Sequence, residues 1–191
     1  MSNVSSNTYT YARVGAILHE IGMVTEEKMR SVLEEAADYA DEEIDHYEAA
    51  GSLEEFGVAV CVHADDIDSI HDDYADLMEA AAKAAGGRVA ITNVRLDEGE
   101  DDLDIGRMDT LTFERNGTPM SIDAEHFAED YYDHAAACEA IAVTAHEDDP
   151  RSWREVDFER EPHRGYDSIM VLVTPEQARA LEERLGFRFP E

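Results

Sequence analysis

The sequence predicts an α+β protein with a mainly antiparallel sheet, an N-terminal helical hairpin and helices packed on the sheet. Apolar residues recur at helical spacing in some segments and alternate in others, and Asn116-Gly117 separates two alternating runs, a strong hairpin signal. The expected helices are 11–22, 25–47, 65–85, 127–145 and 174–186. The expected strands are 56–62, 88–96, 108–115, 118–123, 153–158 and 168–173.

The first half of the chain is predicted to be mostly helical. Gly22 suits the end of the first helix, and Thr25 suits the N-cap of a second helix whose apolar stripe continues to Tyr47. Ser52-Leu-Glu-Glu55 matches a capping box, and Gly86-Gly87 ends the third helix. We expect a disordered segment 1–7, a helical hairpin with a β–α segment at 8–86, and an α+β sheet region at 87–191. The alternative is one continuous domain.

The hairpin sets the register of the second half. A two-residue turn at Asn116-Gly117 places Phe113 opposite Met120 on a buried face. Pro119 has no amide proton to donate, so we expect strand 118–123 to lie at a sheet edge. The helix that follows should bury Phe127 and Tyr131 on its apolar stripe.

The C-terminal elements have clear boundary signals. The run Ile169-Met-Val-Leu-Val173 is continuously apolar, as in a strand buried on both faces. Thr174-Pro-Glu-Gln177 combines an N-cap, proline at the first helical position and glutamine at the capping-box position. These signals predict a final helix that Gly186 ends.

Charge is the unusual property of this chain. Its 191 residues include 46 Asp and Glu against 15 Lys and Arg, a formal net charge of −31, while 43% hydrophobic content is ordinary for a folded protein. Such a chain repels nucleic acid and anionic membranes and attracts basic proteins. Three explanations stay open: a salt-adapted or compositionally drifted surface, a surface that meets a basic protein, and imitation of nucleic acid.

One predicted helix face concentrates this charge. In the expected helix 25–47, acidic residues recur four apart with hardly a cation between them, and each like-charge pair costs roughly 0.2–0.5 kcal/mol in an isolated helix. We predict that this face binds a basic partner. Its residues are Glu34, Asp38, Asp41, Glu42 and Asp45.

The residues that could form catalytic or metal motifs are the histidines, the cysteines and the acidic loop 97–104. Three histidines, at 46, 71 and 126, follow an acidic residue by three positions, but about two such pairs arise by chance in so acidic a chain. The acidic loop lacks the EF-hand pattern, and no phosphate-binding glycine loop or nucleophile elbow is found. We therefore expect no enzyme, metal or cofactor.

A second contact surface is predicted beside the hairpin. Tyr132, Asp133 and His134 follow the edge strand, and an exposed tyrosine among acids suits a protein contact. No apolar run reaches membrane-spanning length, the N-terminus lacks a signal-peptide pattern, and two cysteines make no disulfide framework. A cytoplasmic location without membrane or direct nucleic-acid contact is expected.

Residues 88–187 resemble small bacterial immunity proteins of polymorphic toxin systems. The likeness lies in the Phe113-Glu-Arg-Asn-Gly117 hairpin, Ala124-Glu-His126, Asp130-Tyr-Tyr-Asp133 and the final Thr174-Pro-Glu-Gln-Ala-Arg-Ala-Leu181 helix. The resemblance implies a non-catalytic inhibitor whose acidity blocks a basic toxin such as a nuclease. Fast, salt-dependent association would be its physical signature.

Overall fold

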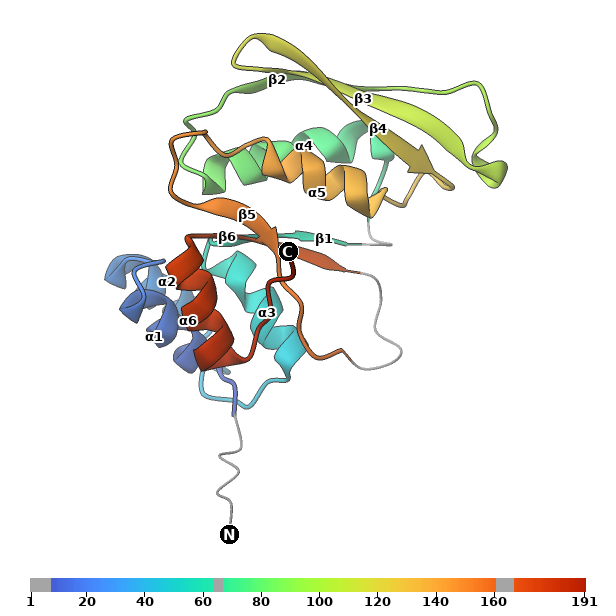
Figure 1. Ribbon diagram of the computed structural model, residues 1–191. Helices are drawn as coiled ribbons and strands as arrows, with labels where there is room; N and C mark the ends of the chain where they lie inside the picture. The colour runs from blue at the N-terminus through green and yellow to red at the C-terminus, as the bar shows by residue number, and fades with distance from the viewer. Residues whose placement is uncertain (1–7, 64–66, 161–166) are drawn as a thin grey trace.

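The computed structural model describes residues 8–63, 67–160 and 167–191, and these form four stacked layers (Figure 1). The helices are α1 (Tyr11–Glu20), α2 (Glu26–Glu35), α3 (His46–Glu55), α4 (Ile70–Ala84), α5 (His134–Ala142) and α6 (Pro175–Leu185). The strands are β1 (Ala59–Val62), β2 (Ile91–Asp97), β3 (Arg107–Arg115), β4 (Thr118–His126), β5 (Ser152–Glu155) and β6 (Ser168–Val173). A short 3₁₀ turn, Leu103–Ile105, lies between β2 and β3.

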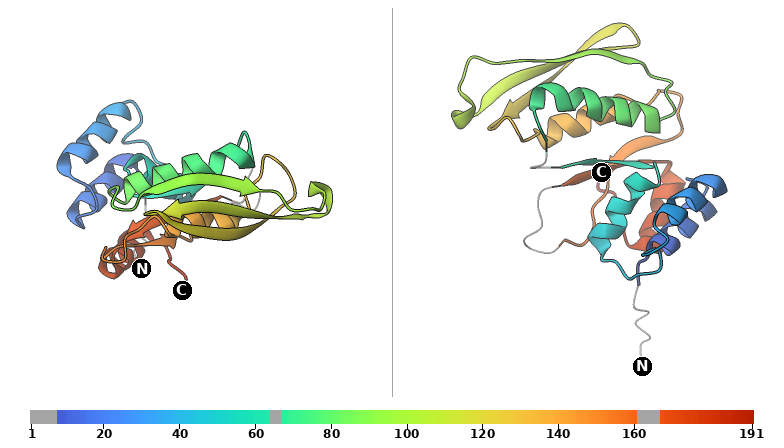
Figure 2. Two further views of the ribbon diagram at one scale, coloured as in Figure 1. Left: turned by 90° about the horizontal axis from the view of Figure 1, so that it is seen from above. Right: turned by 180° about the vertical axis from the view of Figure 1, so that it is seen from behind.

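The strands divide between two antiparallel sheets, with orders β2-β3-β4 and β1-β6-β5. Helices α4 and α5 lie between the two sheets, and the other helices cover the far face of β1-β6-β5 (Figures 1 and 2). The α+β prediction is confirmed. Its division into two sheets was not visible in the sequence, because strand pairing depends on long-range contacts.

The sheet β1-β6-β5 is buried on both faces, as the continuous apolar run of β6 indicates. Met170 and Leu172 face the α4–α5 layer, whereas Ile169, Val171 and Val173 face the N-terminal helices and α6. Two hydrophobic cores therefore meet at one sheet. Because β1 pairs with β6, this sheet also joins segment 8–86 to segment 87–191.

The hairpin forms with the predicted register. Arg115 pairs with Thr118 and Phe113 with Met120, and the turn residues Asn116 and Gly117 have φ values of 50° and 80°. Strand β4 is at the edge of its sheet, which confirms the prediction from Pro119. Both strands continue beyond the expected range, to Arg107 and His126.

The single helix expected at 25–47 is wrong. Helix α2 ends at Glu35, turns follow, and Asp45 caps the separate helix α3 in a capping box with Glu48. An antiparallel bridge between Tyr9 and Ile44 needs extended backbone there, and this contact outweighs the local helical pattern. The expected capping box at Ser52 is also wrong, because Ser52 lies inside α3 and its hydroxyl donates to the Ala49 carbonyl.

The helix expected from residue 127 starts only at His134. Its N-cap is Asp133, whose carboxylate accepts the amides of Ala135 and Ala136. Phe127 and Tyr131 therefore lie outside the helix and are exposed rather than buried, which corrects the predicted stripe.

The remaining boundaries differ by a few residues. Helix α4 starts after its N-cap Ser69, and Thr174 and Gln177 form the predicted capping box of α6, which Gly186 ends in a left-handed conformation. The segment 1–7 expected to be disordered lies outside the described residues. No helix in the described ranges is long and apolar enough to cross a membrane.

Candidate functional site

Polar and exposed apolar residues converge at one end of the β2-β3-β4 sheet. The loop from β2 to β3, the connection from β4 to α5 and the first turn of α4 meet there. The site has three parts: a buried polar network, a surface cluster of one histidine and two glutamates, and an apolar patch.

The buried network links β3, β4 and α4. Asp109 accepts from Arg107 Nε at 2.6 Å and Nη2 at 3.1 Å, and its Oδ2 lies 2.8 Å from His126 Nδ1. His126 Nε2 lies 2.9 Å from the Tyr74 hydroxyl. This pattern assigns the proton of a neutral His126 to Nδ1, so Tyr74 donates to Nε2 and accepts the Asp133 amide.

The network holds Asp109 ionised although the carboxylate is fully buried. Burial opposes its charge, but hydrogen bonds from Arg107, the Gly99 amide and His126 outweigh that effect and lower the pKa of Asp109. Burial raises the pKa of Tyr74, which stays a neutral donor. Arg107 and Asp109 thus form a buried ion pair in which each carboxylate oxygen of Asp109 accepts two hydrogen bonds.

The hydrogen-bonded series from Asp109 through His126 to Tyr74 has the order of a catalytic triad, in which an acid orients a histidine beside a hydroxyl. The burial of all three side chains indicates a structural role instead. Tyr74 and Asp109 are 0% exposed, and His126 is 1% exposed. Tyr132 also packs edge-on against Tyr74, with ring centroids 4.8 Å apart. A substrate cannot reach the hydroxyl in this packing.

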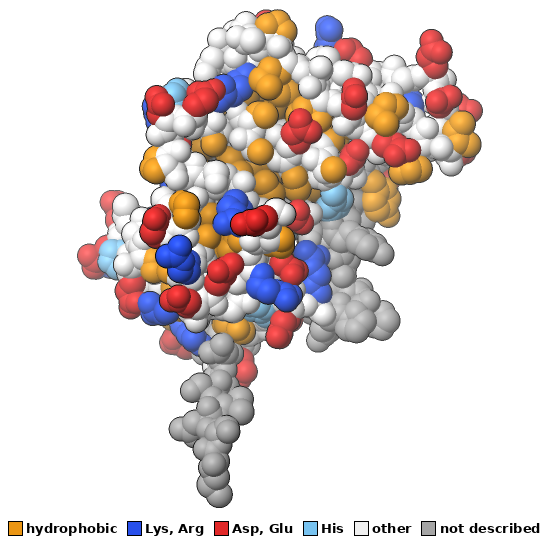
Figure 3. Space-filling view, in the orientation of Figure 1, with side chains coloured by type: hydrophobic (Ala, Val, Ile, Leu, Met, Phe, Trp, Pro, Cys, Tyr) orange, Lys and Arg blue, Asp and Glu red, His pale blue; other side chains and the backbone are white. Residues whose placement is uncertain are grey.

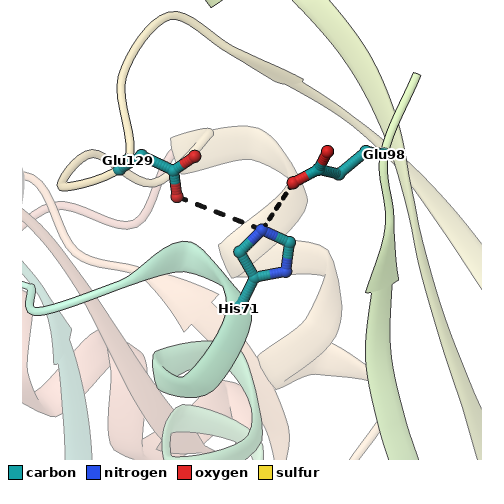
Figure 4. Close-up of side chains that lie close together, drawn as sticks. All are labelled: His71, Glu98 and Glu129. Carbon is teal, nitrogen blue, oxygen red and sulfur yellow. Dashed lines mark hydrogen bonds and ion pairs between the residues drawn. The ribbon is translucent and has the colours of Figure 1, made fainter. Parts of the chain in front are cut away.

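The surface cluster, which we call the His71 cluster, consists of His71, Glu98 and Glu129 (Figure 4). His71 Nε2 lies 2.9 Å from Glu98 Oε1 and 4.0 Å from Glu129 Oε2. The residues come from α4, the loop after β2 and the connection after β4, and the three side chains point toward one another. Within the described residues, this is the one group with metal-ligating atoms so close together.

The apolar patch consists of Ile105, Met108 and Phe127, which are 73%, 54% and 61% exposed. The Phe127 ring lies against Gly106, where an added methyl group would come within 3.0 Å of it. In Figure 3, hydrophobic side chains at this end of the upper sheet lie among acidic ones. The acidic residues in these segments are exposed: Glu98, Glu100, Asp101, Asp102, Asp104, Glu125, Glu129 and Asp130.

The predicted contact residues beside the hairpin are engaged in internal contacts. Tyr132 packs on Tyr74, and the Asp133 carboxylate also accepts the Glu125 amide. His134 Nδ1 lies 3.0 Å from the Ser168 hydroxyl, and burial lowers the pKa of His134. Their exposed neighbours are Phe127 and Tyr131, the residues expected in the core.

The five acidic residues Glu34, Asp38, Asp41, Glu42 and Asp45 are all exposed, but they do not share one helix face. Glu34 is in α2, the next three follow its end, and Asp45 caps α3. These five residues therefore form an exposed acidic segment and not a stripe along one helix face. No signal in the sequence distinguished this break from a continuing helix except the accumulation of like charges.

Neither the His71 cluster nor the apolar patch was predicted from the sequence. The fold brings Glu98 and Glu129 to His71, rather than Asp68, the acidic residue three positions before it in the sequence. The available signal for the patch was an isolated isoleucine, Ile105, within an acidic stretch and next to a glycine.

Both cysteines are free thiols. Burial raises the pKa of Cys138 to about 11 and that of Cys61 further, so neither has the character of a nucleophile. Comparison of the chain with protein-family models, curated proteins and solved structures gave no match.

Proposed function

We propose that this protein is a non-catalytic binding protein for a basic partner, of the kind that an immunity protein presents to a toxin such as a nuclease. The net charge of −31 supplies long-range attraction, and the resemblance of residues 88–187 to immunity proteins supports the inhibitor role. A cytoplasmic location belongs to the same proposal.

The apolar patch within an acidic surround carries the proposal. Interfaces combine a desolvated apolar centre with a polar rim, and exposed apolar residues grouped on a soluble surface mark such sites. Between Asp97 and Asp133 the cations are Arg107 and Arg115. Arg107 is buried on Asp109, and Arg115 binds Glu147 and the carbonyls of Val143 and Ala145. The surface around the apolar patch therefore carries a net negative charge, and a partner that complements this charge is basic.

The apolar patch and the acidic residues around it contribute to different steps of binding. Full burial of one such side chain contributes roughly 1.5–3 kcal/mol, so the three partly exposed residues together supply about 3–6 kcal/mol. A micromolar complex needs about 8 kcal/mol, so further contacts are required. The charges raise the association rate, while the patch slows dissociation.

The polar groups of a groove on the β2-β3-β4 sheet are bonded to one another across the strands. A groove of about 710 Å³ lies there, lined by residues that include Arg95, Thr112 and Ser121. Thr112 accepts from Arg95, and Glu114 accepts from Thr92, so these groups are held in cross-strand contacts. The groove contains neither a histidine nor a cysteine.

The test captures the partner from native lysate of the source organism and then measures kinetics with the purified protein. Two charge variants each lose four carboxylates by Glu→Gln and Asp→Asn changes, one at residues 34, 38, 41 and 42, the other at 100, 101, 102 and 104. A patch variant carries Ile105→Ser and Met108→Ser, and its control is the double variant Arg179→Ser/Glu183→Ser, because both residues are exposed on α6 and lie outside the patch and both acidic segments.

We expect a basic partner at stoichiometric amounts, and an association rate that falls as salt rises from 50 to 500 mM. The charge variant at residues 100, 101, 102 and 104, which lie beside the patch, should show the flatter salt dependence, and the patch variant should dissociate about tenfold faster than Arg179→Ser/Glu183→Ser. Captured proteins that DNA releases would favour nucleic-acid mimicry. No saturable partner, together with stability that rises into molar salt, would refute the proposal in favour of salt adaptation.

A further inference from the structure

We propose that the His71 cluster binds one divalent transition-metal ion, with Zn²⁺ the best fit among common ions. This inference does not depend on the proposed function. Its ligands are His71 Nε2, Glu98 Oε1 and Glu129 Oε2, which all lie within 4.8 Å of one another (Figure 4).

The distances suit a shared ion. Zinc bonds to nitrogen and oxygen are about 2.0–2.2 Å, so tetrahedral ligand atoms lie roughly 3.4 Å apart. The distances from His71 Nε2 to Glu98 Oε1 and Glu129 Oε2, 2.9 and 4.0 Å, bracket that value. Rotation of exposed side chains closes the difference without movement of the backbone. The ion takes the place of the Nε2 proton that the imidazole donates to Glu98, and this proton passes to solvent.

The backbone already holds the three ligands in place. The Ile70 amide donates to the Glu129 carbonyl at 2.9 Å, which fixes the β4–α5 connection against α4. The Gly99 amide donates to buried Asp109 at 2.8 Å, which fixes the residue after Glu98. The ligands therefore come from three separately anchored segments, and binding requires little ordering of the chain.

Two positive groups lie near the proposed ion site, and nearby carboxylates compensate the charge of each. Arg107 Nη1 is 3.5 Å from Glu98 Oε2, but this guanidinium is paired with Asp109 and leaves Oε1 facing His71. The N-terminus of α4 carries a partial positive charge, and Asp72 and Asp73 in its first turn counter it. Arg107 also orients the Glu98 carboxylate, as outer groups do at metal sites.

The donor set selects the ion class. One imidazole and two carboxylates suit Zn²⁺, Mn²⁺ or Fe²⁺, whereas Mg²⁺ and Ca²⁺ prefer oxygen ligands alone. Among these three transition metals, Zn²⁺ binds nitrogen and oxygen sites most strongly. Three protein ligands leave a fourth position for water.

The ion would also connect the site to the apolar patch. Glu129 lies between Phe127 and Tyr131 in the sequence, so its coordination ties this exposed segment to α4 and to the loop after β2. A metal-bound protein should present the patch in one conformation.

The test is calorimetric titration of the tag-free protein with Zn²⁺ in 150 mM NaCl and 5 mM Mg²⁺, which occupies non-specific carboxylates. We expect one saturable site. His71→Ala and Glu129→Gln should each weaken binding at least tenfold. The matched control is His146→Ala: His146 also has two acids nearby, but Glu147 lies 3.8 Å from Nε2 and Asp148 lies 3.8 Å from Nδ1, so they cannot share one ion.

Trp153 fluorescence verifies that each variant is folded, because this tryptophan is buried in the α4–α5 core. No saturable site in the wild-type protein would overturn the inference. Equal losses in His71→Ala and His146→Ala would overturn it as well. A zinc-binding protein without a basic partner would leave this inference standing and refute only the proposed function.

Discussion

The substitution Asp109→Asn tests whether the buried network holds the β2-β3-β4 sheet on the helices. Asparagine keeps the size of the side chain but replaces one acceptor oxygen with an NH₂ donor. That donor would face the guanidinium of Arg107 or the Nδ1–H of His126, which are both donors. Arg107 would also become a buried charge without its counter-ion.

The expected loss is large. Removal of one partner from a buried ion pair costs about 3–5 kcal/mol, whereas a domain is stabilised by only about 5–15 kcal/mol in total. Asp123→Asn is the matched control, because Asp123 is an exposed aspartate on neighbouring β4. Its free energy of unfolding should change by less than about 0.5 kcal/mol.

Urea unfolding followed by Trp153 fluorescence measures both variants. Because the folded-state pKa of Asp109 is lowered, its stabilisation is complete above the unfolded pKa of about 3.9 and is lost as pH falls through the folded pKa. The difference between wild type and Asp109→Asn should therefore shrink below about pH 4. A difference at pH 7 within 1 kcal/mol of the Asp123→Asn control would refute this account.

Local geometry supports three further predictions. Gly99→Ala should destabilise the protein by at least about 1 kcal/mol more than Gly51→Ala in urea unfolding. An added methyl group at Gly99 would clash with the backbone carbonyl of Met108, whereas nothing lies within 4 Å of one at Gly51; equal losses would contradict that close approach. Asp45→Ala should cost about 1 kcal/mol by removing the α3 cap, while Asp41→Ala stays within about 0.5 kcal/mol. A stabilising Asp45→Ala would instead indicate a continuous helix. Cys138, whose pKa burial raises to about 11, should react with a disulfide reagent at pH 8 at least about tenfold more slowly in the folded protein than in urea, and equal rates would show an open thiol.

Local sequence signals determined the elements whose ends depend on nearby residues. The Asn116-Gly117 turn requires positive φ at both positions, and that requirement alone sets the register of β3 and β4. The capping box of Thr174 and Gln177 likewise places the start of α6. In both cases the decisive contacts lie within a few residues of each other, so they are visible in the sequence.

Tertiary structure decided the elements whose local signals compete with distant contacts. The helical spacing of Phe127 and Tyr131 predicted their burial, but His126 continues β4 into the buried network and Asp133 delays the start of α5. The Tyr9–Ile44 bridge similarly divides the expected long helix. Side-chain spacing cannot reveal these partners.

The candidate site belongs to the second group. Composition alone showed the acidity, on which the proposal of a basic partner rests. The His71 cluster joins residues 71, 98 and 129, and the apolar patch joins residues on either side of the hairpin, so neither has a sequence spacing. The sequence determined the sign of the charge and the hairpin that frames this surface; the packing of α4 and of the β4–α5 connection against the sheet decided which side chains meet there, because only chain folding brings such distant residues within bonding distance.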